Sequence, residues 1–304
     1  SLRCPSSTNH DQPQRHPPIW TSVPHSAGAP TVTSSKLPKD SRALRIYSEV
    51  FGLERLNYGV WEPGAELTFA NLKQAQQRYE DEIVALIPDG VERILDVGCG
   101  TGVLSARLHA SGYHVEGVSP SPSQEAQFRE KSEAPFHLSR FEDVEVDEPF
   151  DCIIMSESAQ YIPLDRLFEK AGACLSDGGV LIVWDFFTLS HATGIHAKSG
   201  HELDAFREAA AQAGFRCRGE RDVTELAAPT MEFATDLARR AEIGLALGTE
   251  RLRERRPLTY RLARWLLRKQ IAKVERQRPL IDPAAFREYK RYMSFVLDYD
   301  GATA

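Results

Sequence analysis

The chain has 304 residues, which suits one large domain or one domain with elaborations. Hydrophobic residues make up 42% and charged residues 26% of it, the balance of a globular protein with a substantial core. The formal net charge of -6 argues against a nucleic-acid partner, and no apolar run approaches the ~20 residues of a membrane span.

The cysteines and the first residues of the chain indicate the cellular compartment. The 5 cysteines are scattered, odd in number and without a CxxC pair, which is typical of free thiols in a reducing compartment. The first residues lack the charged and then apolar pattern of a secretory signal. We therefore expect a cytoplasmic protein.

Two segments precede the first predicted strand. Residues 1–40 are rich in Pro, Ser, Thr and His and lack apolar periodicity, so we expect a disordered tail. Apolar side chains then recur at helical spacing over residues 66–87, and Pro88-Asp89-Gly90 ends that helix. The pattern predicts an N-terminal helical lid over residues 41–90.

Short apolar strands and helices of about ten residues alternate over residues 91–228, which we expect to form the core. The predicted strands cover residues 94–97, 113–118, 136–138, 150–155, 180–184 and 215–223. Such alternation indicates a parallel sheet with helices on both faces. Residues 229–291 become mostly helical, and residues 292–304 contain a last strand. We expect an α/β, doubly wound, seven-stranded and mostly parallel sheet, with a helical cap inserted before the last strand.

The first strand runs into a glycine turn, Gly98-Cys99-Gly100-Thr101-Gly102, which begins the next helix. Glycines permit a tight bend and let a ligand approach the backbone, near the free N–H groups of a helix start. A P-loop would need a Lys after the turn, and none follows. A dinucleotide fingerprint would need Gly at Val103 and an acid near Val118-Ser119-Pro120. The P-loop interpretation therefore fails, and the dinucleotide interpretation is weak.

The pattern formed by Asp96, Gly98, Gly100 and Gly102 resembles the motif of Rossmann-like, S-adenosylmethionine-dependent methyltransferases. The resemblance covers roughly residues 55–225. It implies a Rossmann-like fold, S-adenosyl-L-methionine as cofactor and S-adenosyl-L-homocysteine as its product. It also implies that these four residues lie at the methionine part of the cofactor. A turn that only links strand to helix is the alternative.

A second segment, GVSPSPSQ at residues 117–124, resembles one in cyclopropane-fatty-acid synthases and some terpenoid C-methyltransferases. The resemblance implies that Ser119, Ser121 and Gln124 contact the ribose. After the third strand, many members carry an acid facing the adenine. Arg140 stands at that position, a departure from the family, so the adenine contact is expected from Phe141 or Glu142.

A third segment, NYGVW at residues 57–61, resembles a stretch that lies over the methionine end and the acceptor in small-molecule members. Tyr58 is therefore a candidate cofactor contact and Trp61 a candidate substrate contact. Ordinary core aromatic residues are the alternative.

Methyl transfer from a sulfonium is an in-line displacement, in which alignment and water exclusion do most of the work. Ligands bind at the ends of strands four and five in such sheets. Strand four ends in Ser156-Glu157-Ser158-Ala159-Gln160-Tyr161, without the Pro-Pro motif of nucleic-acid amino-methyltransferases. Ser156 is a candidate cofactor contact, and Glu157 and Tyr161 are candidate catalytic residues. An ordinary loop acid is the alternative for Glu157.

Strand five ends in Trp184-Asp185-Phe186-Phe187, in which Trp184 and Phe187 are candidate substrate contacts. The following loop holds His191 and His196, candidate general bases for a hydroxyl or carboxyl acceptor, or else two solvated histidines. Their five-residue spacing does not bring side chains onto one helix face, so we expect no metal site.

Residues 250–278 are strongly basic, with eleven Lys or Arg against three Glu. A solvated helix with its apolar stripe on the core is the simplest interpretation. A membrane-surface helix, or a site for an anionic acceptor, is the sharper alternative.

Together these patterns predict methyl transfer to a small, hydrophobic, specialised metabolite at carbon, nitrogen or oxygen. Two other hypotheses stay open: a non-catalytic cofactor-binding partner, and a methyltransferase of RNA or protein.

Overall fold

The computed structural model describes residues 52–301. The expected tail at residues 1–40, the start of the expected lid and residues 302–304 lie outside the described residues. All the described residues belong to one compact unit.

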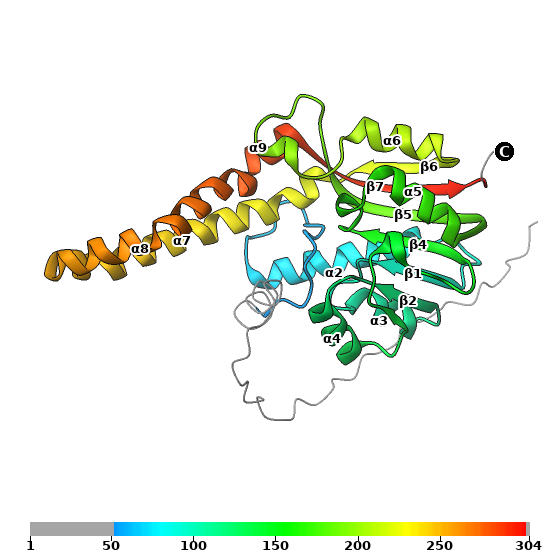
Figure 1. The fold of residues 1–304 in the computed structure, drawn as a ribbon, viewed down its shortest axis with the longest axis horizontal. Helices are drawn as coiled ribbons and strands as arrows, with labels where there is room; N and C mark the ends of the chain where they lie inside the picture. The colour runs from blue at the N-terminus through cyan, green and yellow to red at the C-terminus, as the bar shows by residue number, and fades with distance from the viewer. Residues whose placement is uncertain (1–51, 302–304) are drawn as a thin grey trace, which may run out of the picture. The chain divides into compact units, whose positions relative to one another are not determined.

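A seven-stranded sheet organises the described residues, in the order β3-β2-β1-β4-β5-β7-β6 (Figure 1). Strands β1 to β5 run parallel, whereas β7 is antiparallel to both β5 and β6. The strands are β1 (Arg93–Val97), β2 (His114–Val118), β3 (Phe136–His137), β4 (Phe150–Ser156), β5 (Leu175–Thr188), β6 (Phe215–Asp222) and β7 (Lys290–Tyr299). This confirms the expected fold class.

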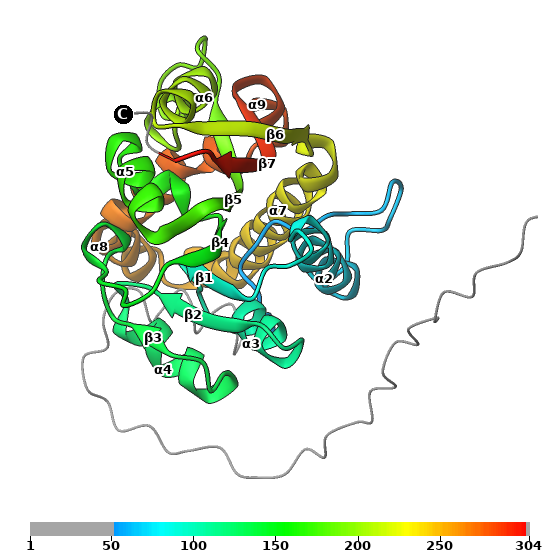
Figure 2. The same cartoon turned by 90° about the vertical axis from the view of Figure 1, so that its right-hand side faces the viewer.

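Helices cover both faces of the sheet. They are α2 (Phe69–Leu86), α3 (Val103–Ala110), α4 (Pro122–Lys131), α5 (Leu164–Cys174), α6 (Leu203–Gln212), α7 (Thr224–Arg255), α8 (Pro257–Gln277) and α9 (Pro283–Tyr289). Helix α5 lies on one side of the sheet and α2 and α3 on the other (Figure 2). The pattern of the central strands explains this arrangement. Successive residues of a strand face opposite sides, so Leu95 joins one buried cluster and its neighbour Ile94 the other.

Two element boundaries differ from the sequence expectation for local reasons. Helix α2 begins at Phe69 rather than near residue 66, because the Thr68 side chain accepts a hydrogen bond from the Asn71 N–H and caps the helix. Helix α7 begins at Thr224 rather than at residue 229. Its start lies directly after β6, where the Asp222 carboxylate accepts hydrogen bonds from the N–H and the hydroxyl of Thr224.

The helical insertion between β6 and β7 contains a hairpin formed by α7 and α8, which lie side by side (Figures 1 and 2). The joined ends of the two helices lie away from the sheet, while the first turns of α7 pack Ala227 and Met231 into the core. No helix within residues 52–301 is long and apolar enough to cross a bilayer.

Candidate active site

A cavity of about 770 Å³ opens at the carboxyl ends of β1, β2 and β4. This is the edge at which open parallel sheets bind ligands. Eleven of the residues singled out from the sequence line it: Asp96, Gly98, Gly100, Ser119, Ser121, Gln124, Phe141, Glu142, Ser156, Glu157 and Tyr161. Segments far apart in the sequence therefore meet around one space.

The three glycines of the turn differ in what surrounds them. All adopt left-handed backbone angles, with φ of 72° at Gly98, 55° at Gly100 and 80° at Gly102. A Cβ on Gly98 would lie 2.4 Å from Cβ of Ser158, and one on Gly102 would lie 2.8 Å from the Phe128 ring. Gly100 has open space beside it. Gly102 thus faces the core and does not line the cavity, whereas Gly98 and Gly100 do.

Asp96 is buried near the carboxyl end of β1 and lines the cavity. Its Oδ2 accepts a 2.5 Å hydrogen bond from the Ser105 hydroxyl of α3. Burial raises the pKa of Asp96 to about 6, and the Ser105 hydrogen bond opposes that rise. The carboxyl group is held in one orientation beside the glycine turn.

A polar group from before β1, which no sequence pattern pointed to, also lines the cavity beside the glycine turn. Arg55 Nε donates to Glu80 Oε1 at 2.8 Å, and Gln76 Nε2 donates to the Asn57 carbonyl at 2.8 Å. The other Glu80 oxygen, Oε2, and the Asn57 side-chain oxygen are buried without a hydrogen-bond partner. Arg55, Asn57 and Glu80 all line the cavity. Unpartnered buried oxygens of this kind can accept hydrogen bonds from a ligand.

The ends of β2 and β3 supply the opposite wall. The Ser119 hydroxyl donates to Gln124 Oε1 at 2.5 Å, and the Ser121 N–H donates to the Ser119 hydroxyl at 3.2 Å. Phe141 is buried and Glu142 is half-buried, one turn after β3. Hydroxyl, amide and aromatic groups are thus clustered there.

Glu157 follows β4 and lines the same cavity, next to the chain segment of Asn57 and Tyr58. It has a φ of 55° and is the one non-glycine residue within 52–301 with a positive φ. One carboxylate oxygen, Oε1, accepts from the Tyr58 N–H at 2.8 Å and from the Tyr292 hydroxyl at 2.5 Å. Burial raises the pKa of Glu157 to about 8, against the effect of these two hydrogen bonds. Strained backbone and a perturbed carboxyl together are typical of a functional position.

Two buried tyrosines contact Glu157 and Ser156. Tyr292 of β7 is fully buried, and its ring centroid lies 5.4 Å from that of Tyr58. Tyr79 of α2 is also buried, and its hydroxyl lies 2.8 Å from the Ser156 hydroxyl. Tyr79 was not singled out from the sequence, because its helical spacing marks it only as a core residue.

Three predicted aromatic contacts lie elsewhere. Trp61 is buried, and its indole N–H donates to the Thr230 hydroxyl of α7 at 2.7 Å. Trp184 packs edge-on against Tyr79, with ring centroids 4.9 Å apart. Phe187 packs against Phe206 on the other face of the sheet. Among the described residues that line the cavity, none is Trp61, Trp184 or Phe187. The backbone of Tyr58 reaches Glu157, but its side chain packs on Phe286.

The two loop histidines also lie outside the cavity. His191 Nε2 is 2.9 Å from the Glu288 carbonyl, and the His196 ring stacks on Tyr289 at 5.2 Å. Lys290 anchors the loop to the end of β5, because its Nζ donates to the Ser199 hydroxyl at 3.0 Å and to the Thr188 hydroxyl at 2.7 Å. The loop therefore folds over α9 and the start of β7, and it does not bring either imidazole to Glu157. Over residues 52–301, no three His, Cys, Asp or Glu side chains gather as metal ligands.

Comparison with known sequences gives a family. Residues 72–219 match a family described as a methyltransferase domain. The 27-O-demethylrifamycin SV methyltransferase of Amycolatopsis mediterranei is 25% identical over 207 residues, 60% of this chain and 74% of that enzyme. Two further methyltransferases, from Geobacillus and Staphylococcus carnosus, are matched over 42% and 53% of their own lengths.

Solved structures agree on the fold. The cyclase SpnF has a TM-score of 0.60 at 19% identity, over 86% of this chain and 93% of that one. Geranyl diphosphate C-methyltransferase from Streptomyces coelicolor A3(2) has a TM-score of 0.57 at 16% identity, over 81% and 91%. Such identities show the fold alone, and one fold can serve different reactions. Residues 72–219 therefore match a methyltransferase domain, which confirms the resemblance carried by the glycine turn.

Proposed function

We propose that the chain transfers a methyl group from S-adenosylmethionine to a small, hydrophobic acceptor held beside Glu157. The observation that carries the proposal is one continuous cavity that both the glycine turn and Glu157 line. Its volume of about 770 Å³ lies within the ~300–1,000 Å³ of ligand pockets, so it has room for more than a cofactor fragment.

The residues present fit this cofactor. The unpartnered oxygens of Asn57 and Glu80 suit an ammonium group, and Asp96 and Gly98 line the same cavity. Ser119, Ser121 and Gln124 suit the two hydroxyls of a ribose, and Phe141 with Glu142 suits an adenine. S-Adenosylmethionine, when bound, supplies a methyl group activated by its sulfonium.

Glu157 carries the proposed chemistry of the chain's own residues. With its pKa at about 8, the carboxyl changes charge near neutral pH, where a general base or a cation-stabilising group works best. The Tyr58 N–H and the Tyr292 hydroxyl hold Oε1 in place, which leaves the second oxygen to face the acceptor. Tyr161, close by and largely exposed at the cavity wall, is positioned to hydrogen-bond the acceptor.

The lining favours an apolar acceptor over a macromolecule. Leu56 and Ile162 line the cavity near Glu157, and Arg55 and Arg140 are the Lys or Arg residues that line it in the described part of the chain. An RNA substrate would call for a broad basic strip leading into the site. The relatives named for rifamycin and geranyl diphosphate also support a small-molecule acceptor.

Isothermal calorimetry with S-adenosylmethionine and S-adenosylhomocysteine tests the cofactor, and transfer of labelled methyl to a panel of small apolar acceptors tests the reaction. We expect binding of both ligands, loss of binding in Gly100→Arg, and label in an acceptor. Absence of binding by the unmodified chain would overturn the proposal. Binding without transfer to any acceptor would instead favour the non-catalytic hypothesis.

A further inference from the structure

Helix α8 presents an exposed apolar stripe that no part of the described chain covers. Leu258 is 76% exposed, Leu262 57%, Trp265 58% and Leu266 60%. These positions are spaced by four, three and one residues, so they lie on one face of the helix. Side chains this exposed add nothing to the core, and they correct the expectation that the apolar stripe of this segment packs there.

A different side of α8 packs on α7. Tyr260 and Ala263 are half-buried, and the two helices are in contact along the hairpin. Counting 100° per residue, Tyr260 lies about 160° around the helix from both Leu258 and Leu262. The exposed stripe is therefore additional to the one that holds the hairpin together, and it is free to contact something outside the chain.

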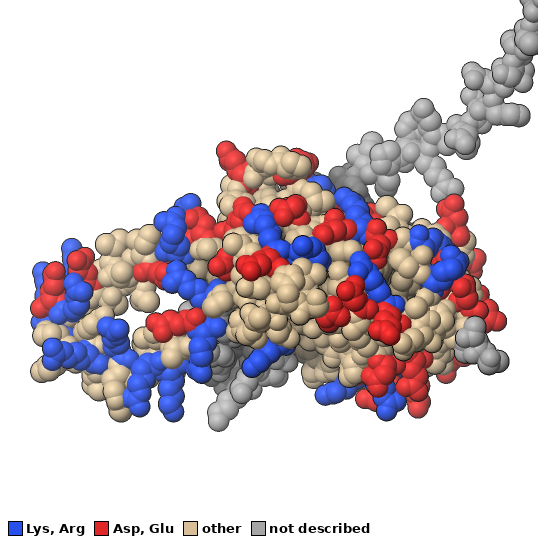
Figure 3. Space-filling view, turned by 90° about the horizontal axis from the view of Figure 1, so that it is seen from above, with Lys and Arg blue, Asp and Glu red and all other residues tan. Residues whose placement is uncertain are grey.

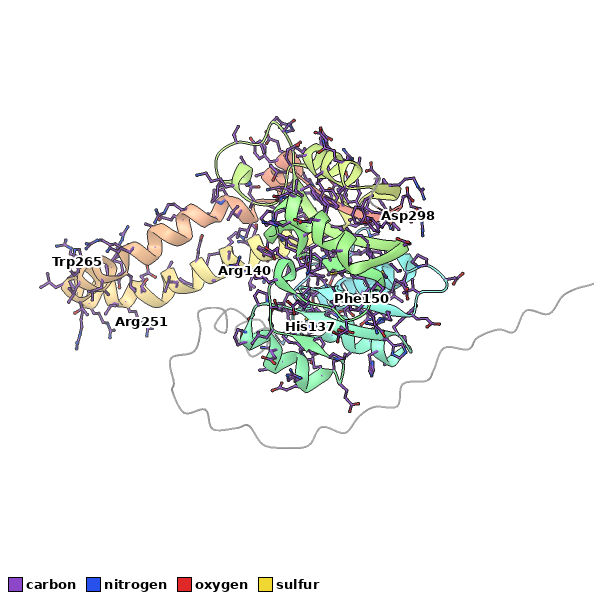
Figure 4. The ribbon with its side chains drawn as sticks, turned by 45° about the vertical axis from the view of Figure 1, so that its right-hand side comes forward. His137, Arg140, Phe150, Arg251, Trp265 and Asp298 are labelled. Carbon is purple, nitrogen blue, oxygen red and sulfur yellow. The ribbon has the colours of Figure 1, made fainter. Side chains whose placement is uncertain are left out.

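Unpaired positive charge flanks the stripe. Arg261, Arg264 and Arg268 are exposed, and none of them forms an ion pair within the described residues. Arg268 instead lies over the Trp265 ring, 4.6 Å from its centroid. Lys and Arg side chains gather along the hairpin (Figure 3), and Trp265 and Arg251 lie at its end away from the sheet (Figure 4).

We propose that the α7–α8 hairpin docks on the surface of an anionic lipid bilayer through the α8 stripe of Leu258, Leu262, Trp265 and Leu266. A helix with Leu and Trp on one face and Arg beside them is the pattern of interfacial helices, in which the apolar face enters the boundary between headgroups and acyl chains. The excess of eleven Lys or Arg over three Glu in residues 250–278 complements anionic headgroups.

Charge and chemistry disfavour two other occupants. A second copy of the hairpin would bring two strongly basic segments together. A nucleic acid would pair with the arginines but would leave Leu258, Leu262 and Leu266 in water. A bilayer surface that is anionic outside and apolar beneath satisfies both halves of the pattern.

The test is co-sedimentation of the full chain with vesicles of phosphatidylcholine alone and of phosphatidylcholine mixed with phosphatidylglycerol. We expect binding to the mixed vesicles and little to the neutral ones. Each basic residue at an anionic surface is worth about fivefold in partitioning, so a triple variant of Arg261, Arg264 and Arg268 to Gln should bind on the order of 100-fold less.

The apolar half is tested by Leu262→Ser with Trp265→Ser, which should also abolish binding. Arg166→Gln and Arg129→Gln, on α5 and α4, are matched surface controls that should bind normally. Because the substituted side chains are exposed, the melting temperature and cofactor affinity of the variants should not change, which separates this proposal from the proposed function.

Three results would overturn the proposal. They are equal binding to neutral vesicles, no binding to either kind, and loss of a dimer or of RNA binding in the same variants without loss of lipid binding.

Discussion

The Glu157 carboxylate and the Tyr292 hydroxyl meet at 2.5 Å, although β5 lies between their strands in the sheet. Glu157 follows β4, and Tyr292 enters from β7, the strand that runs against the others. The contact fixes one oxygen of the carboxyl group, which lines the cavity.

Glu157→Gln should slow methyl transfer by ~10²- to 10⁴-fold, the usual contribution of a general acid or base, while the affinity for S-adenosylmethionine changes little. Gln keeps the shape of the side chain and removes its charge. Steady-state turnover and calorimetry on the same preparation measure the two effects. Glu169→Gln, an exposed acid on α5, is the control. Turnover within twofold of the unmodified enzyme would leave Glu157 without a chemical role.

The turnover of the unmodified enzyme should rise with pH through about 8. The pKa of Glu157 is raised to about 8, so its base form accumulates as the pH passes that value. A pH profile of turnover at saturating cofactor measures the apparent pKa. Tyr292→Phe removes a hydrogen bond to the ionised form and should move this apparent pKa upward. A profile flat between pH 6 and 9 would contradict the assignment.

Folding stability should fall as the pH rises from about 4 to about 7, in part through Asp185. Burial raises the pKa of this carboxyl to about 7, although it accepts hydrogen bonds from the N–H groups of Gln160 and Phe186. A folded state that binds a proton more tightly than the unfolded chain loses stability as that proton leaves. Urea melts at several pH values measure the slope. Asp185→Asn should flatten it, and an unchanged slope would count against this origin.

Gly98→Ala should destabilise the fold more than Gly178→Ala. Both glycines have a left-handed backbone, with φ of 72° and 76°, so either substitution costs ~1–2 kcal/mol in the free energy of unfolding. Only Gly98 adds a clash, with Ser158 at 2.4 Å, whereas Gly178 has nothing within 4 Å. The clash should add ~1–3 kcal/mol and weaken cofactor binding. Denaturant melts of the pair isolate the packing contribution, and equal losses would exclude it.

Asn57→Ala and Glu80→Ala should each weaken S-adenosylmethionine binding by ~10- to 100-fold, the cost of a lost charge-assisted hydrogen bond. The same variants should bind 5′-methylthioadenosine normally, because that molecule has no amino-acid end. Calorimetry with both ligands makes the comparison within one protein. Glu82→Ala, on the same helix and away from the cavity, is the matched control. Parallel losses for both ligands would indicate misfolding rather than a lost contact.

The sequence alone predicted the sheet, the glycine turn and the serine-rich segment after β2, because each depends on residues that are neighbours in the chain. Strand and helix periodicity, and the backbone freedom of Gly98 and Gly100, are local properties. The Ser119–Gln124 pair likewise lies within one turn. Parallel strands then bring their carboxyl ends to one edge, which is why Asp96 and Glu157 could be expected near each other.

Only the tertiary structure decided which side chains face the cavity. Trp184 and Phe187 are three residues apart on one strand, so they point to opposite faces and enter opposite cores. His191 and His196 follow a loop whose path depends on its anchor at Lys290, which the sequence pattern does not reveal. Side-chain contacts such as Tyr292 with Glu157 join residues far apart in the chain. They depend on strand order and on the direction of β7, and no local pattern carries that information.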